Sequence, residues 1–290
     1  MDVLVWGKNC PPKEYALADK EGQSAARFMQ TSTHIVVGAS SGIGRSVALA
    51  LARERRHVTL IGRHEERLKR VAREVVMFGG EPLVAVSDVR EPVSIQAALA
   101  QVVLRNLRIE LVVLSSGVGL TTDADEFTAD TLQTLLEVNV LGAAHWLEAL
   151  QPLLKVQAGG ASVAVLSSLA ADRAYPGASA GYSASKAALS HLCDGLRAPW
   201  AAQNIRLITV EPGFIRTPMT TEQSWLPFLM EPEDAAQVIL DGLRAEKRVV
   251  RFPQMAALTT TAIRLLPPGL LDRLYEIKPP GGVRVGNVRE

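Results

Sequence analysis

Tyr182 and Lys186 are the residues of this sequence whose types and spacing could move a proton. They stand four apart in Tyr182-Ser183-Ala184-Ser185-Lys186, a segment that reads as helix, so both side chains share one helix face. A free tyrosine keeps its proton until about pH 10, and a neighbouring ammonium favours the phenolate. The pair therefore predicts a tyrosine that acts as an acid or base. The alternative is a solvated helix face, which the same two residue types commonly occupy.

Polar groups at the ends of two apolar runs favour an acid or base role for Tyr182 over a solvated helix face. Ser167 and Ser168 end the apolar run 162–166, and Glu211-Pro212-Gly213 follows the run 205–210. Open parallel sheets bind ligands at the carboxyl ends of their strands. We therefore expect these groups to gather near Tyr182, with Ser168 favoured over Ser167 as the reactive serine.

Composition limits the possible classes of protein. The chain has 290 residues, 48% of them apolar, and a net charge of +1, which fits one α/β domain and gives no basic footprint for nucleic acid. Cys10 and Cys193 stand at neither metal-ligand nor disulfide-framework spacing, so we expect no metal site and a reducing, cytoplasmic setting. No apolar run is long enough to span a bilayer, and no signal peptide is seen.

The start of the chain differs in pattern from the rest. Residues 1–30 have no sustained period and are expected to form a loose extension. This extension either follows from an upstream start codon, with Met29 nearer the true start, or forms an arm on a partner subunit. Residues 31–253 are expected to form the main domain.

A glycine-rich segment follows the first apolar run. The run His34-Ile35-Val36-Val37 leads into Gly38-Ala39-Ser40-Ser41-Gly42-Ile43-Gly44 and then into a helical pattern. Glycines in such a strand–turn–helix unit permit close approach of a pyrophosphate, whose charge is met by backbone N–H groups at the helix start. An ordinary βα turn is the alternative, but it would rarely need three glycines.

With these residues in view, the chain resembles the short-chain dehydrogenase/reductase family, whose motifs are T-G-x-x-x-G-x-G and Y-x-x-x-K. The resemblance covers about residues 33–250, and Val37 replaces the usual threonine, which predicts a slightly altered turn. It implies a single domain with a Rossmann-type, doubly wound parallel sheet of about seven strands and helices on both faces. Six strands are expected within the runs 34–37, 58–61, 83–86, 111–114, 162–166 and 205–210.

The resemblance also assigns residues that would bind the adenosine half of a dinucleotide. Gly62 stands where an NAD-dependent relative would have an acid, and Arg63 can bind a 2′-phosphate, so the expected cofactor is NADP(H). A solvated loop arginine is the alternative for Arg63. Asp88, followed by Val89, matches the aspartate that binds the adenine amino group, unless it only caps the next helix.

Two further segments complete the implied cofactor site. Ser115-Ser116-Gly117 replaces the family's N-N-A-G, so two serines are expected to act as shorter substitutes for the usual residues. In the turn that begins with Pro212 and Gly213, the Ile215 backbone and the Thr217 hydroxyl are expected to hold the nicotinamide carboxamide.

The implied activity is NADPH-dependent interconversion of a carbonyl and a secondary alcohol. Ser168 would bind the carbonyl oxygen, Tyr182 would donate the proton, and Lys186 would lower the Tyr182 pKa and bind the ribose. Asn139 would resupply the proton through an ordered water. No metal is needed. A homodimer or homotetramer, packed through the helices near 131–154 and 182–203, is expected.

Other functions stay open at this point. A dinucleotide-binding regulatory protein without turnover would keep the fold, although the intact Ser168, Tyr182 and Lys186 argue against it. A nucleotide-sugar epimerase or dehydratase is the third possibility, but the tail is short for one.

The last two segments bear on the substrate. A lid at 217–231, with Trp225 as a contact, and a helical tail at 254–290 packed on the same domain are expected to enclose a lipophilic carbonyl compound. The tail repeats apolar residues at Met255, Leu258, Ala262 and Leu265. The alternatives are completion of the core, a subunit interface, or shallow membrane contact.

Overall fold

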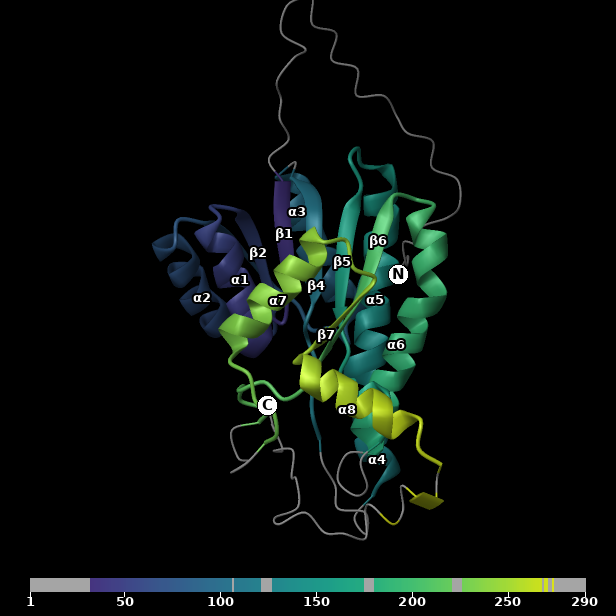
Figure 1. Ribbon diagram of the computed structural model, residues 1–290. Coiled ribbons are helices and arrows are strands. Elements are labelled where there is room, and N and C mark those ends of the chain that lie inside the picture. The colour runs from purple at the N-terminus through teal and green to yellow at the C-terminus, as the bar shows by residue number, and fades with distance from the viewer. Residues whose placement is uncertain are drawn as a thin grey trace, which may run out of the picture. The chain divides into compact units, whose positions relative to one another are not determined.

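A parallel sheet of seven strands, in the order β3-β2-β1-β4-β5-β6-β7, forms the centre of the computed structural model (Figure 1). The structure describes residues 32–105, 107–120, 127–174, 180–220, 226–267, 269–270 and 273. The strands are β1 (Ser32–Val37), β2 (His57–Gly62), β3 (Glu81–Val86), β4 (Arg108–Leu114), β5 (Ala161–Leu166), β6 (Ile205–Pro212) and β7 (Val249–Phe252). The predicted doubly wound parallel sheet is confirmed.

Helices connect the strands. They are α1 (Gly42–Arg53), α2 (Glu65–Met77), α3 (Pro92–Leu104), α4 (Ala129–Leu136), the π-helix η2 (Glu137–Leu141), α5 (Gly142–Val156), the 3-10 helix η3 (Leu169–Ala171), α6 (Ala180–Ala201), α7 (Pro232–Arg244) and α8 (Gln254–Arg264). No helix among the described residues is long and apolar enough to cross a membrane.

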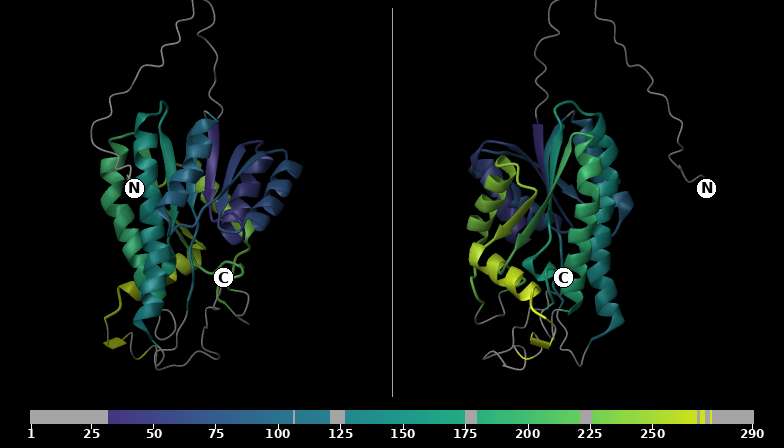
Figure 2. Two further views of the ribbon diagram at one scale, coloured as in Figure 1. Left: turned by 180° about the vertical axis from the view of Figure 1, so that it is seen from behind. Right: turned by 45° about the vertical axis from the view of Figure 1, so that its right-hand side comes forward.

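Helices cover both faces of the sheet (Figure 2). In β1, Ile35 and Val37 pack with α3, α5 and α6, whereas Val36 packs with α1, α2 and α7. Residues that alternate along a strand point to opposite faces, so a strand covered on both sides must be apolar throughout. This explains why the central strands read as continuous apolar runs in the sequence.

The strand ends depart from the sequence-based expectation in two places. β4 begins at Arg108, before the apolar run starts, and β6 continues through Pro212. β7 was not located from the sequence, because it is only four residues long and includes Arg251. It pairs in parallel with the end of β6, where Glu211 faces Arg251 in register.

Candidate active site

The strands end at the edge of the sheet where α8 lies (Figure 1). β1 pairs with β2 on one side and with β4 on the other, so the chain reverses its direction of winding between β1 and β4. A crevice at such a switch point is the usual ligand site of an open parallel sheet. Each predicted site segment that the structure describes follows a strand at this edge or lies on a helix beside it.

The glycine turn after β1 is packed too tightly for side chains. Gly38 has φ +84°, and a Cβ built on it would lie 2.7 Å from Ser116 N. A Cβ on Gly44 would lie 2.3 Å from the Gly38 carbonyl oxygen. Ser40, Ser41 and Ile43 complete the turn, and Ser41 makes no side-chain cap on α1. The first N–H groups of α1 therefore point toward the crevice without a side-chain partner at the cap, as an anion site requires.

Ser115 compensates for the valine that replaces threonine in the motif. Its Oγ donates a hydrogen bond of 2.6 Å to the Val37 carbonyl, and its N–H donates one of 2.9 Å to the same oxygen. The end of β4 is thus tied to the glycine turn from the opposite strand. The slightly altered turn stays a prediction.

The far end of the crevice carries Arg63 after β2 and Asp88 after β3. The Asp88 carboxylate accepts hydrogen bonds from Arg90, at 2.9 Å from its N–H and 2.7 Å from Nη2. These bonds, with a smaller effect of Arg63, hold the pKa of Asp88 below its usual value. Arg90 was not found from the sequence, since a lone exposed arginine after a strand carries no signal.

The capping role considered for Asp88 is wrong. The N-cap of α3 is Glu91, and no side-chain cap bond is made there. Val89 is buried, and a Cβ on Gly142 would lie 2.6 Å from its Cγ2. Val89 therefore packs against the start of α5 with its side chain.

Ser168, Tyr182 and Lys186 lie together. The Ser168 Oγ accepts a hydrogen bond of 3.1 Å from Ala170 N, donates one of 3.4 Å to the Pro212 carbonyl, and lies close enough to the Tyr182 phenol to lower its pKa. Lys186 Nζ lies 5.8 Å from the centre of the Tyr182 ring and donates a hydrogen bond of 2.9 Å to the Leu166 carbonyl. The structure thus gathers three side chains from β5 and α6 that the sequence singled out.

Burial dominates the acid–base properties of this group. It raises the pKa of Tyr182 above its ordinary value, and the hydrogen bond to Ser168 acts in the opposite direction. It also lowers the pKa of Lys186 to about 8. The expected lowering of the Tyr182 pKa by Lys186 is wrong for the protein without cofactor, because desolvation of the phenolate raises this pKa and the opposing effect comes from Ser168.

Asn139 is buried in the π-helix η2. Its Oδ1 accepts a hydrogen bond of 2.8 Å from Val118 N, and its Nδ2 donates to Val118 O and Ser185 Oγ, both at 3.0 Å. A Cβ on Gly117 would lie 3.1 Å from Asn139 Oδ1 and 3.4 Å from Lys186 Nζ. Glycine at 117 therefore leaves space between the amide and the ammonium.

The turn after β6 reaches back to the glycine turn. Gly213 N donates a hydrogen bond of 2.7 Å to Phe252 O, and Ile215 forms a bridge with Met230. A Cβ on Gly42 would lie 3.1 Å from Thr217 Cγ2. The two predicted cofactor segments, Gly38–Gly44 and Pro212–Thr217, thus meet across the crevice.

The lid and tail are described only in part. Trp225 and residues 221–224 lie outside the described residues, as does most of the tail beyond 267. In α8 the apolar stripe faces outward, with Met255 59%, Leu258 65% and Leu265 79% exposed. The alternative that these side chains complete the core is wrong, because the opposite face of the helix meets the domain. Leu258 lines a shallow hollow beside Arg251, and enclosure of a substrate stays a prediction.

The described residues contain no group of three or more His, Cys, Asp or Glu side chains that could hold a metal ion. The fold and the crevice define a Rossmann-type protein with a tyrosine–lysine–serine site at the edge of its sheet.

Comparisons with known proteins agree with this class. A family model described as short chain dehydrogenase matches residues 32–225. The chain is 35% identical over 253 residues to an uncharacterized oxidoreductase of Myxococcus xanthus (strain DK1622), covering 84% of this chain and 96% of that protein. The chain belongs to the short-chain dehydrogenase family and is an oxidoreductase.

Two solved structures show the same fold. An alcohol dehydrogenase from the archaeon Thermococcus sibiricus, complexed with 5-hydroxy-NADP, superposes with a TM-score of 0.68 at 26% identity and covers 76% of this chain and 94% of that one. A short-chain dehydrogenase/reductase from Burkholderia phymatum, in complex with NAD, has a TM-score of 0.72 at 19% identity and covers 87% and 98%.

Proposed function

We propose that this protein is an NADPH-dependent oxidoreductase that interconverts a carbonyl and a secondary alcohol on a small, lipophilic substrate. The observation that carries the proposal is the gathering of Ser168, Tyr182 and Lys186 at the carboxyl edge of the sheet, with Lys186 Nζ 5.8 Å from the centre of the Tyr182 ring. A nicotinamide dinucleotide is supported by the structural neighbours, which hold an NADP derivative and NAD.

The residues of the crevice fit such a cofactor. The glycine turn would receive the pyrophosphate, because backbone groups occupy the space that side chains would need. Arg63 would bind a 2′-phosphate, and Asp88 would face the adenine. Ser115, Ser116 and Gly117 would line the middle of the site, and the turn with Pro212, Gly213, Ile215 and Thr217 would hold the carboxamide. The bound cofactor supplies or accepts a hydride.

The chain's own groups handle the proton. Tyr182, kept protonated by burial, donates its phenolic hydrogen to the carbonyl oxygen, while Ser168 donates a hydrogen bond to that oxygen. Lys186 uses one N–H on Leu166 O and keeps two for the ribose hydroxyls and the phenolate. A water in the space at Gly117, between Asn139 Oδ1 and Lys186 Nζ, would resupply the proton.

The test is NADPH oxidation, followed at 340 nm, over a panel of ketones and aldehydes. Turnover with at least one compound is expected, and it must vanish in Tyr182→Phe. Binding of NADPH without turnover of any compound would instead favour a regulatory dinucleotide-binding protein. Turnover of nucleotide sugars without net NADPH consumption would favour an epimerase or dehydratase.

The proposal of a lipophilic substrate depends on the apolar side chains of the lid 217–231. Its described part contains the buried Leu226 and the exposed Phe228, so apolar side chains are present near the cofactor turn. Catalytic efficiency should rise along a homologous ketone series by up to about 0.8 kcal/mol per methylene until the pocket is full. Trp225→Ala should flatten this slope. Equal efficiency across chain lengths, or a preference for free sugars, would contradict a lipophilic pocket.

We also propose a homodimer or homotetramer packed through the helices near 131–154 and 182–203. Leu141, in the middle of that first region, and Val156, two residues beyond it, are 50% and 82% exposed and would gain from being covered. Light scattering of the purified protein would measure the mass, and a monomer at micromolar concentration would contradict the proposal.

A further inference from the structure

A half-buried charged cluster lies beside the proposed catalytic residues and takes no part in the chemistry above. It consists of Arg251 on β7, Glu211 on β6 and Asp172 directly after η3. Arg251 Nε lies 3.1 Å from Glu211 Oε2, and Arg251 Nη2 contacts the Asp172 carboxylate. The acid side chains are only 12% and 9% exposed, and burial raises the pKa of Glu211 although the charge of Arg251 acts in the opposite direction.

The Asp172 branch of the cluster leads to Ser168. Ser168 begins η3, and its Oγ accepts the N–H of Ala170, while Asp172 follows the last residue of the same short turn. Asp172 is held by Arg251, with Arg264 Nη1 of α8 at 3.6 Å. The direction of the Ser168 hydroxyl therefore depends on a turn whose other end is fixed by this cluster.

The Glu211 branch leads to α6. Ser190 Oγ lies 3.2 Å from Glu211 Oε1 and 2.8 Å from Ser167 Oγ, and Ser167 donates a hydrogen bond of 2.9 Å to the Lys186 carbonyl. Ser190 stands one helical turn after Lys186, on the same face of α6. This branch therefore ends at the backbone carbonyl of Lys186, the proposed catalytic lysine.

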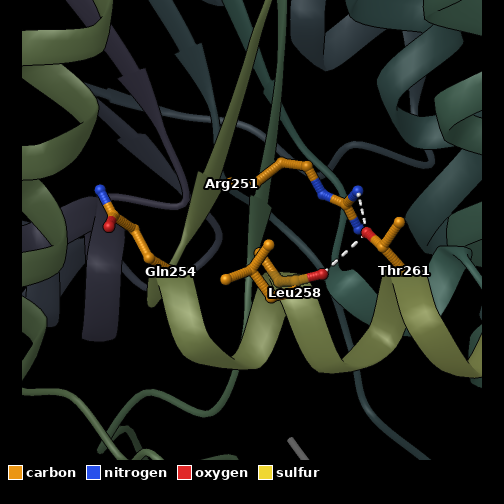
Figure 3. A pocket seen from close by; sticks show the side chains of 5 residues that line it. Arg251, Gln254, Leu258 and Thr261 are labelled. Carbon is orange, nitrogen blue, oxygen red and sulfur yellow. Dashed lines mark hydrogen bonds between the residues drawn. The ribbon is translucent and has the colours of Figure 1, made fainter.

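Helix α8 contacts the Arg251 guanidinium through threonine side chains (Figure 3). Arg251 Nη1 donates a hydrogen bond of 3.1 Å to Thr261 Oγ1, and Thr260 Oγ1 lies 3.4 Å from Nη2. A shallow hollow of about 300 Å³ lies between this arginine and the helix, lined by Arg251, Gln254, Ala257, Leu258 and Thr261. The two threonine hydroxyls of α8 orient the planar guanidinium of Arg251 toward Asp172 and Glu211.

We propose that Arg251 is a positioning residue that holds the Ser168 turn and the Tyr182–Lys186 part of α6 in a fixed mutual arrangement. Its kinetic consequence rests on the proposed function. Without the guanidinium, Asp172 still has Arg264 Nη1 at 3.6 Å and Glu211 still has the Ser190 hydroxyl, but the two acids lose the group that connects them, so the two branches can move apart. A displacement of about 1 Å between the two segments is enough to lower turnover by a large factor.

The test compares Arg251→Met, Arg251→Lys and the control Arg244→Met. Arg244 pairs with Glu54 and Asp241 on the surface of α7, so its loss removes an arginine ion pair without touching the cluster. We expect Arg251→Met to lower kcat by about 10-fold to 100-fold with the KM for NADPH nearly unchanged. Arg251→Lys should recover part of the loss, and Arg244→Met should behave as wild type.

Hydrogen exchange of the proteins without substrate supplies a second readout. Amides of 166–174 and 180–190 should exchange faster in Arg251→Met than in wild type, while those of β1 and α2 should not change. Unchanged exchange in both segments, or faster exchange over the whole sheet, would overturn the proposal. If Arg251→Met does not fold, Asp172→Asn replaces it and should affect 166–174 alone.

This readout separates the two proposals. If the wild type reduces no carbonyl compound, the proposed function fails, and exchange still decides whether Arg251 positions the two segments. If the wild type is active and Arg251→Met keeps full kcat, the positioning role fails and the proposed function stands.

Discussion

Burial moves the two titratable groups of the site toward their neutral forms. The pKa of Tyr182 is raised and that of Lys186 is lowered to about 8, both chiefly by desolvation. Near neutral pH the phenol therefore holds its proton, and most of the lysine is still charged. This combination suits donation of a proton to a carbonyl oxygen, with the ammonium ready to stabilise the phenolate that forms.

Removing the phenolic hydroxyl tests this role at the level of one atom. Tyr182→Phe should lower kcat by at least about a hundredfold, because only the proton donor is lost, while NADPH affinity and stability stay near wild type. Steady-state kinetics and a fluorescence titration with NADPH measure the two effects. His191→Ala, at an exposed position of the same helix, is the control. Turnover above about a hundredth of wild type would refute the assignment.

Arg63 decides the proposed preference for NADPH. Arg63→Ala should lower the ratio of kcat/KM for NADPH to kcat/KM for NADH. The lost preference should correspond to about 1 to 3 kcal/mol, the usual contribution of a charged hydrogen bond. Arg105→Ala provides the control, because Arg105 is exposed and follows α3, at the opposite edge of the sheet. An unchanged ratio in Arg63→Ala would show that another group selects the cofactor, for which Arg90 is the first candidate.

Among the elements, the π-helix η2 joins two parts of the site. It places the Asn139 amide where it binds both backbone groups of Val118 and the Ser185 hydroxyl of α6. A single wide turn within a helix shifts the side chains that follow it, and such turns often occur at functional sites. The sequence predicted one helical stretch through 131–154, and the structure divides it into α4, η2 and α5 at Asn139.

Asn139→Ala tests how much the hydrogen bonds of Asn139 contribute to the free energy of unfolding. The change leaves both backbone groups of Val118 without the Asn139 amide and removes one of the two hydrogen bonds of Ser185 Oγ, which keeps its bond to the Tyr182 carbonyl. The free energy of unfolding should therefore fall by about 1 to 3 kcal/mol. Urea unfolding followed by circular dichroism gives the value. Gln133→Ala, which removes only an exposed hydrogen bond to Glu137, should cost little. A loss below about 0.5 kcal/mol for Asn139→Ala would mean that water replaces the amide.

On the scale of the whole molecule, two apolar cores on either face of one sheet hold the site edge together. The pairing of β6 with β7 brings Arg251 to Glu211, and α8 follows directly. The C-terminal part of the described chain is therefore connected to the catalytic segments by charges, while its own apolar stripe faces outward.

The N-terminal extension should contribute little to the main domain. Deleting residues 1–28 should leave Tm within about 2 °C and activity within about twofold, because the stretch has no pattern that could bury a face. Differential scanning calorimetry and the NADPH assay measure both. A large loss of Tm would show that these residues form a packed arm.

Elements whose signal is local could be predicted from the sequence. Apolar runs predicted six of the seven strands, because a strand covered on both faces must be apolar along its whole length. The glycine turn and the Tyr182–Lys186 spacing were also readable, since each depends on neighbours within one turn or one helix. The family resemblance then predicted a doubly wound parallel sheet of about seven strands, and the structure supplied the order of the strands.

Only the tertiary structure decided the contacts between distant strand ends. Ser115 replaces the missing threonine hydroxyl across two strands, Arg90 holds Asp88, and Arg251 connects Glu211 to Asp172. Helical spacing showed that α8 has an apolar stripe, but spacing cannot tell which side of a helix meets the domain. These pairings depend on which strands are neighbours and on the rotation of each helix, and no single segment of the sequence contains that information.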